Sequence, residues 1–108
     1  MEVQVYHSQN VRDTYFYREN GDIFNKEQAR ALYLSHDIEK GYLRVADFDI
    51  NNRLFEDETD ILDMIYNDSQ NEDADWRTRR QRSTSVGDII VLDSKVFIVA
   101  SCGFDAIY

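Results

Sequence analysis

Two β-branched runs near the C-terminus constrain the fold more than any other feature of the chain. Residues 89–92 (Ile-Ile-Val-Leu) and 96–100 (Val-Phe-Ile-Val-Ala) are apolar at successive positions, and Asp93-Ser94-Lys95 separates them. Two such runs joined by a short polar turn are typical of a β-hairpin. Because neither run alternates with polar residues, we expect both strands to lie in the middle of a sheet that is covered on both faces.

Alternating patterns predict further strands in the first half of the chain. Val3 and Val5 alternate with Gln4 and Tyr6, which indicates a half-buried strand near the N-terminus. A second alternating strand is predicted at residues 42–50, with one face made of Leu43, Val45 and Asp47 and the other of Tyr42, Arg44, Ala46 and Phe48. Residues 15–17 could form another short strand, and residues 20–22 (Asn-Gly-Asp) have the chemistry of a turn.

Two helices complete the predicted fold. Residues 26–34 are good helix formers that follow a possible N-cap, Asn25. Residues 54–66 form the clearest amphipathic helix, whose apolar arc holds Leu54, Phe55, Ile61, Leu62, Ile65 and Tyr66. We therefore expect an α+β fold in a single domain spanning residues 1–108, with a small, mainly antiparallel sheet packed with two main helices.

Negative charge is concentrated in one segment. The 108-residue chain has 21 acidic and 12 basic residues and a net charge of −9. Residues 47–75 contain eleven acidic residues and one basic residue, Arg53, so this acidic block alone carries −10. Long-range repulsion disfavours direct binding to nucleic acid phosphates or to an anionic membrane surface.

The N-terminus and the cysteine content predict a cytoplasmic protein. The first residues lack both a basic region and an apolar run, and the longest apolar stretches are far too short to span a bilayer. Cys102 is the only cysteine and cannot form an internal disulfide. Because it directly follows a strand predicted to be buried, we expect a small core cysteine and not a nucleophile.

Several segments together resemble a known group of proteins. They are Tyr42-Leu-Arg-Val-Ala-Asp47, Phe55-Glu-Asp57, Asp75-Trp76, Arg82-Ser-Thr-Ser-Val-Gly-Asp88 with the strand after it, and Phe97 to Phe104. The chain thereby resembles, over roughly residues 41–107, a family of small uncharacterised proteins from phages, plasmids and integrative elements. It departs from the family pattern at Asp93-Ser94, where an Asp-Gly turn is more common. The resemblance implies a mobile-element accessory protein and no catalytic residues.

The acidic helix is the first candidate for a functional surface. With a rise of about 1.5 Å per residue, its five carboxylates between Glu56 and Asp63 span roughly 10 Å, close to the charge spacing of duplex DNA. Such a face can mimic DNA and bind the basic groove of a host nucleic-acid-handling defence protein, as an anti-CRISPR or anti-restriction inhibitor does. It can equally be only the solvated side of an amphipathic helix. The predicted partner-binding residues are Glu56, Asp57, Asp60, Asp63, Asp68, Glu72, Asp73, Asp75 and Trp76.

Other features of the sequence leave alternatives open. Trp76 either anchors an interface or covers the edge of the core. A weaker alternative is a calcium-binding module at Asp47–Glu58, where oxygen ligands stand at EF-hand-like offsets. Against it, Asn52 stands where such loops have glycine, the segment before Asp47 is predicted as a strand, and there is no second loop to pair with. The segment from Ser83 to Asp88 is better explained as a tight loop leading into a strand than as a ligand loop. Arg77, Arg79, Arg80 and Arg82 form a basic cluster that either contacts RNA or DNA or, as we expect because it directly follows the acidic block, pairs with acidic groups inside the molecule.

These observations favour an interaction protein without enzymatic activity or a cofactor. The main alternative is an element-maintenance or structural protein that binds its partner through the sheet and has no mimic role. Neither histidine has metal-binding spacing to the other or to Cys102. No carboxylate pair stands in a recognisable acid/base context, and solvated carboxylates would keep their ordinary pKa values.

Overall fold

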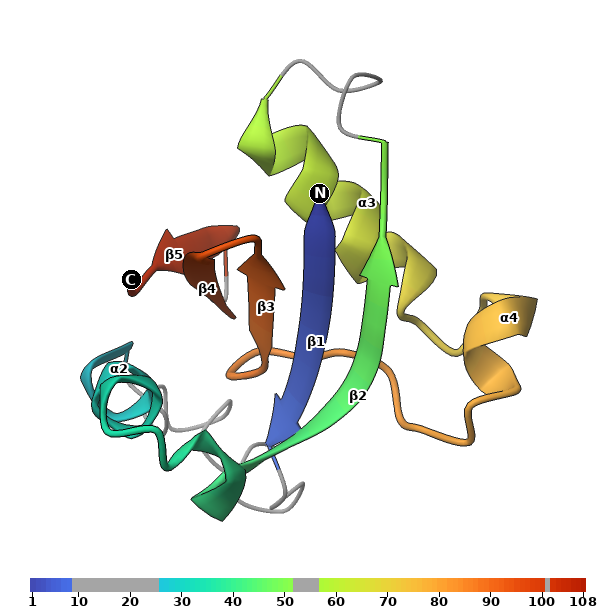
Figure 1. Cartoon of the computed structure of the whole chain (residues 1–108). Coiled ribbons are helices and arrows are strands. Elements are labelled where there is room, and N and C mark those ends of the chain that lie inside the picture. Colours follow the sequence, from blue (N-terminus) through green and yellow to red (C-terminus); the bar gives the residue numbers. More distant parts are fainter. Residues whose placement is uncertain (9–25, 52–56, 101) are drawn as a thin grey trace.

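The computed structural model describes residues 1–8, 26–51, 57–100 and 102–108, and its centre is a five-stranded antiparallel sheet (Figure 1). The strands, in the spatial order β2-β1-β3-β4-β5, are β2 (Tyr42–Asp49), β1 (Glu2–Ser8), β3 (Ile89–Leu92), β4 (Lys95–Val99) and β5 (Phe104–Ala106). The helices are α2 (Lys26–Leu34), the 3-10 helix η1 (Ile38–Lys40), α3 (Glu58–Asp68) and α4 (Ala74–Arg77). The α+β prediction is confirmed.

The predicted hairpin is confirmed, and both of its strands are buried on both faces. Asp93 and Ser94 form its two-residue turn, and Asp93 adopts a positive φ of 52°. Alternate residues of β3 enter different clusters: Ile90 and Leu92 pack on the side of α3, whereas Ile89 and Val91 pack on the side of α2. Period-2 geometry sends these side chains to opposite faces, so the continuous apolar run matches a strand between two layers of helix.

Helix α3 covers one face of the sheet, and α2 covers the other. Figure 1 shows α3 passing behind β1 and β2. Its buried side chains are Ile61, Leu62 and Ile65, and each contributes about 1.5–3 kcal/mol by leaving water. On the opposite face, the fully buried Ala29 of α2 packs with Tyr42 and Ile98.

The amphipathic helix begins later than its apolar pattern predicts. Asp57 has extended backbone angles, and its carboxylate accepts a hydrogen bond from the Asp60 amide at 3.0 Å, so Asp57 is the N-cap. The predicted start at residue 54 is therefore wrong, and the helix continues two residues past the predicted end to Asp68. The side chains of Leu54, Phe55 and Glu56 lie outside the described residues.

Strand β2 contains a bulge that the alternating pattern does not reveal. Val5 of β1 pairs with Ala46 and Tyr6 pairs with Arg44, so the register skips Val45. A one-residue slip reverses the faces of the side chains that follow. Tyr42 therefore packs on the α2 side while Ala46 packs on the α3 side. The prediction that both belong to one face is wrong.

Some elements are missing from the sequence-based prediction, and others cannot be compared with it. The short elements η1, α4 and β5 were not expected. The predicted strand at residues 15–17, the turn at residues 20–22 and the N-cap Asn25 lie outside the described residues.

Candidate partner-binding site

The segment from Arg82 to Asp88 is held by a buried ion pair. The Arg82 guanidinium contacts both carboxylate oxygens of Asp88, with Nη1–Oδ2 at 2.6 Å and Nη2–Oδ1 at 2.8 Å. Asp88 is fully buried and also accepts the amides of Ser8 and Ser85, each at 2.8 Å. Four donors therefore satisfy this carboxylate, as burial of a charge requires. This pair has a structural role, because it fixes the segment that leads into β3.

His7 lies next to this ion pair and is neutral at pH 7. Its Nε2 is 2.8 Å from the Thr84 hydroxyl and 3.9 Å from Asp88 Oδ2. Burial lowers the pKa of His7 to about 4; Asp88 opposes this effect and Arg82 adds to it. The ring of His7 is 5.6 Å from that of Trp76, centroid to centroid, so this polar core touches the helix α4.

Trp76 is fixed in place by the same segment. Its side chain is only 4% exposed, and the indole Nε1 donates to the carbonyl oxygen of Arg82 at 3.0 Å. Asp73 caps α4 by accepting the amides of Asp75 at 2.9 Å and Trp76 at 3.2 Å. Of the two interpretations of Trp76, the structure places it at the edge of the core.

The C-terminal end of α3 joins this unit through side-chain and backbone hydrogen bonds. Gln70 donates from Nε2 to the carbonyl oxygens of Tyr66 and Thr84, both at 2.9 Å. The Thr84 amide donates to the carbonyl of Ser69 at 2.9 Å. The end of α3, the helix α4 and the segment 82–88 therefore form a connected frame.

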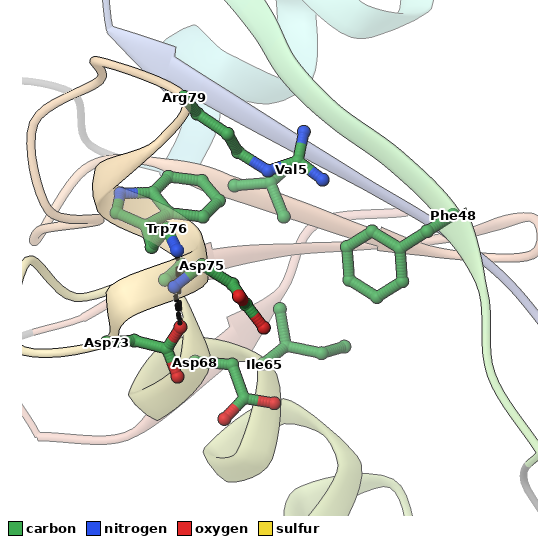
Figure 2. Close-up of a pocket in the computed structure, with 9 residues that line it drawn as sticks. Val5, Phe48, Ile65, Asp68, Asp73, Asp75, Trp76 and Arg79 are labelled. Carbon is green, nitrogen blue, oxygen red and sulfur yellow. Dashed lines mark hydrogen bonds between the residues drawn. The ribbon is translucent and has the colours of Figure 1, made fainter.

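This frame borders a cavity of about 260 Å³ (Figure 2). Its lining residues come from β1, β2, α3, α4 and the chain between and after these helices: Val5, Phe48, Ile65, Asp68, Ser69, Asp73, Asp75, Trp76 and Arg79. Figure 2 shows the carboxylates of Asp68, Asp73 and Asp75 on one side of the cavity and the Arg79 guanidinium on the other. We call these nine residues the acidic pocket.

The acidic pocket carries an excess of negative charge. Its three carboxylates face one guanidinium, and no ion pair among the described residues involves Asp68, Asp73 or Asp75. Partial burial raises the pKa of Asp68, and the nearby Asp73 raises it further. This result corrects the expectation that all the carboxylates would keep ordinary pKa values. The pocket therefore offers an electrostatic environment that favours a bound cation.

The other predicted binding residues have different surroundings. Asp60 and Asp63 are exposed on α3, and Glu72 is exposed in the turn before α4. Asp57 is engaged as a helix cap. The structure therefore brings Asp68, Asp73, Asp75 and Trp76 together, whereas Asp60 and Asp63 do not line the pocket.

The arginine cluster does not pair with the acidic block within the described residues. Arg82 pairs with Asp88, which lies outside the block. Arg79 donates to the carbonyl of Val45, the residue skipped at the bulge, at 3.3 Å. The acidic block instead pairs with bases outside the arginine cluster: Asp47 with Arg44, three residues earlier, at 3.6 Å, and Glu58 with the distant Lys95 at 3.0 Å.

Two other chemical predictions change with the structure. Cys102 is exposed, so its assignment to the core is wrong: β4 ends at Val99, and the chain turns there toward Gly103, which has a positive φ of 87°. Asp47 and Asp49, two proposed calcium ligands, are held in β2 by pairing with β1. In the part of the chain that the structure describes, no group of three or more His, Cys, Asp or Glu side chains is arranged to hold a metal ion.

Sequence reasoning missed several residues of this site. Val5, Phe48 and Arg79 line the pocket, and His7 and Asp88 support its frame. The signal for Asp88 was present in the segment that leads into β3, but nothing in the sequence connects that segment with Phe48.

None of the helices among the described residues has the length and apolar character needed to cross a membrane. Comparisons with models of protein families, with curated proteins and with solved structures found no match for this chain.

Proposed function

We propose that this protein acts in the cytoplasm by binding another protein through the carboxylates of α3 and α4. The proposed partner is a host nucleic-acid-handling defence protein, of the CRISPR or restriction type, whose basic nucleic acid channel the acidic surface would occupy. The resemblance to phage and plasmid proteins supports this choice of partner. The activity is inhibition by binding and requires no catalytic step.

The observation that carries the proposal is a group of carboxylates with no structural task. Asp60, Asp63, Glu72 and Asp75 are exposed, and no hydrogen bond or ion pair of their carboxylates occurs among the described residues. Asp68 stands in the last turn of α3, where a negative charge faces the negative end of the helix dipole. These five residues form the proposed binding surface, which we call the free acidic surface.

Concentrated charge of this kind speeds the approach of a basic partner. Complementary fields raise association rates by orders of magnitude at low salt, and the effect weakens when salt screens the charges. The chain places −10 within residues 47–75, while the remaining residues are close to neutral. The negative electrostatic field of the protein therefore arises mainly from this one segment.

The proposal can be tested by challenging restriction-proficient and CRISPR-proficient hosts with phage while the protein is expressed. We expect protection of the phage against at least one defence system, and loss of protection when Asp60, Asp63, Asp68 and Asp75 are changed to Asn. Asp57 and Asp73 stay unchanged because they cap helices. The control is Asp49→Asn with Asp105→Asn, two exposed carboxylates outside the surface. Absence of protection in every host, or equal protection by the neutralised variant, would contradict the proposal.

A second candidate function is binding through the sheet, as an element-maintenance or structural protein. The observation that favours it is Leu43, which is 51% exposed on β2 at one edge of the described sheet. A Leu43→Lys variant separates the candidates: it should abolish binding through the sheet and leave inhibition by the free acidic surface unchanged.

A further inference from the structure

We propose that the acidic pocket binds the guanidinium group of an arginine side chain presented by a partner protein. This inference rests on the proposed function, because the arginine would belong to the basic surface that the free acidic surface attracts. The bound arginine would give the contact between the free acidic surface and its partner one specific binding position, in addition to the general attraction of opposite charges.

The size of the pocket suits a side chain. Its volume of about 260 Å³ is below the roughly 300–1,000 Å³ of pockets that take drug-sized ligands. Four apolar side chains line it, namely Val5, Phe48, Ile65 and Trp76. One of them, Phe48, is a partly exposed aromatic ring, and a flat, weakly hydrated cation stacks well against such a ring.

The charges of the pocket select a cation with several donors. Asp68 and Asp75 have no hydrogen bond to their carboxylates among the described residues, whereas Asp73 already accepts two amides. The two unused carboxylates come from different segments, α3 and α4, and both lie on the same side of the cavity (Figure 2). A guanidinium has five N–H donors in a planar fork and can reach two carboxylates together, which a single ammonium does less well.

The chain itself shows that the pocket's tryptophan accepts a guanidinium. The Cζ atom of Arg79 lies 5.7 Å from the centroid of the Trp76 ring. Arg79 is exposed, and its hydrogen bond to Val45 is long, at 3.3 Å. It forms no ion pair with the three carboxylates within the described residues. Arg79 thus lies against Trp76 without pairing with these carboxylates, which on this inference stay available to a second guanidinium.

The test uses the fluorescence of Trp76, which is the only tryptophan of the chain and lines the pocket. The probes are three capped tripeptides, Gly-X-Gly, in which X is arginine, lysine or citrulline, the neutral analogue of arginine. We expect the arginine peptide to bind with a Kd of about 1 mM, because it makes only a few charge-assisted hydrogen bonds. Lysine should bind about fivefold more weakly, and citrulline should give no response.

Pairs of variants that change the net charge equally, inside and outside the pocket, show whether the arginine peptide binds in the pocket. Asp68→Asn with Asp75→Asn should weaken binding of the arginine peptide about tenfold. Asp49→Asn with Asp105→Asn removes the same charge elsewhere and should change it less than about twofold. Thermal unfolding of each variant checks that it is folded. Arg79→Ala should strengthen binding relative to Arg77→Ala, because both remove one positive charge but only Arg79 lines the pocket.

A fourth probe, polylysine, separates this inference from the proposed function. If polylysine binds through the free acidic surface but the arginine peptide leaves Trp76 fluorescence unchanged, the pocket inference is wrong and the proposed function stands. If neither probe binds, both fail. Equal responses to arginine and citrulline, or an arginine response that survives in the Asp68/Asp75 variant, would overturn the inference.

Discussion

The buried His7 makes the stability of the fold depend on pH. In the folded protein burial lowers the pKa of His7 to about 4, from 6.5 for a histidine in water. Between these two values the unfolded chain binds a proton that the folded chain does not bind. The free energy of unfolding must therefore decrease as the pH falls through this window, and the full contribution is present above about pH 6.5.

The size of the effect follows from the two pKa values. Each unit of difference corresponds to about 1.4 kcal/mol, so His7 alone lowers the free energy of unfolding by about 2 kcal/mol at pH 5 and by about 3 kcal/mol at pH 4. These losses are large for a domain whose total stability is about 5–15 kcal/mol. Protonation also places a positive charge beside Arg82, and among the described residues the Asp88 carboxylate is the one acidic group that pairs with both cations.

Urea unfolding of the natural chain and of His7→Gln, at intervals between pH 7 and pH 5, measures this contribution. The variant can retain a hydrogen bond to Thr84 but has no proton to bind, so its stability should change less with pH by about 2 kcal/mol over this range. Subtracting one curve of unfolding free energy against pH from the other cancels the contribution of the titrating groups that both proteins share. Parallel curves, or an NMR titration of His7 with a midpoint near 6.5, would refute the reasoning.

Two further predictions concern the carboxylates with structural tasks. Asp57→Ala removes the cap of α3 and should lower the free energy of unfolding by about 1 kcal/mol, measured by urea unfolding. Asp57→Asn should lower it much less, because asparagine also caps helices. Equal losses in the two variants would argue against the cap. Asp88→Ala leaves the amides of Ser8 and Ser85 without their acceptor and the Arg82 guanidinium without its counter-ion, so it should cost about 3–5 kcal/mol, measured in the same way. A loss below about 1 kcal/mol would mean that the network contributes little.

The central sheet was predictable because its signals are local. The apolar runs of β3 and β4 and the alternation of Val3 and Val5 each identify a strand within a few residues. The bulge at Val45 was not predictable, because the register of β2 depends on its partner strand β1, which is distant in sequence. For the same reason the short strand β5 was missed: it forms by pairing with β4.

The sequence predicts that the candidate site is acidic, but it does not predict how the side chains of the site are arranged. All four of Asp57, Asp60, Asp73 and Asp75 are aspartates of the same acidic block. Asp57 and Asp73 cap helices, whereas the carboxylates of Asp60 and Asp75 accept no backbone amide from the residues that the structure describes. The apolar side of the pocket comes from Val5 and Phe48 of the sheet, and only the folded chain brings them to α4. Cys102 illustrates a related error, since a residue that follows a buried strand can already lie in an exposed turn.

The central claim is that the free acidic surface competes with nucleic acid for a basic channel. It is tested most directly with the purified defence nuclease identified by the phage challenge, by adding the protein either before or after the nuclease has bound its DNA. We expect strong inhibition of cleavage when the protein is added first, little inhibition when DNA is added first, and weaker inhibition as salt increases. Inhibition that is independent of the order of addition, or that persists after Asp60, Asp63, Asp68 and Asp75 are changed to Asn, would contradict it.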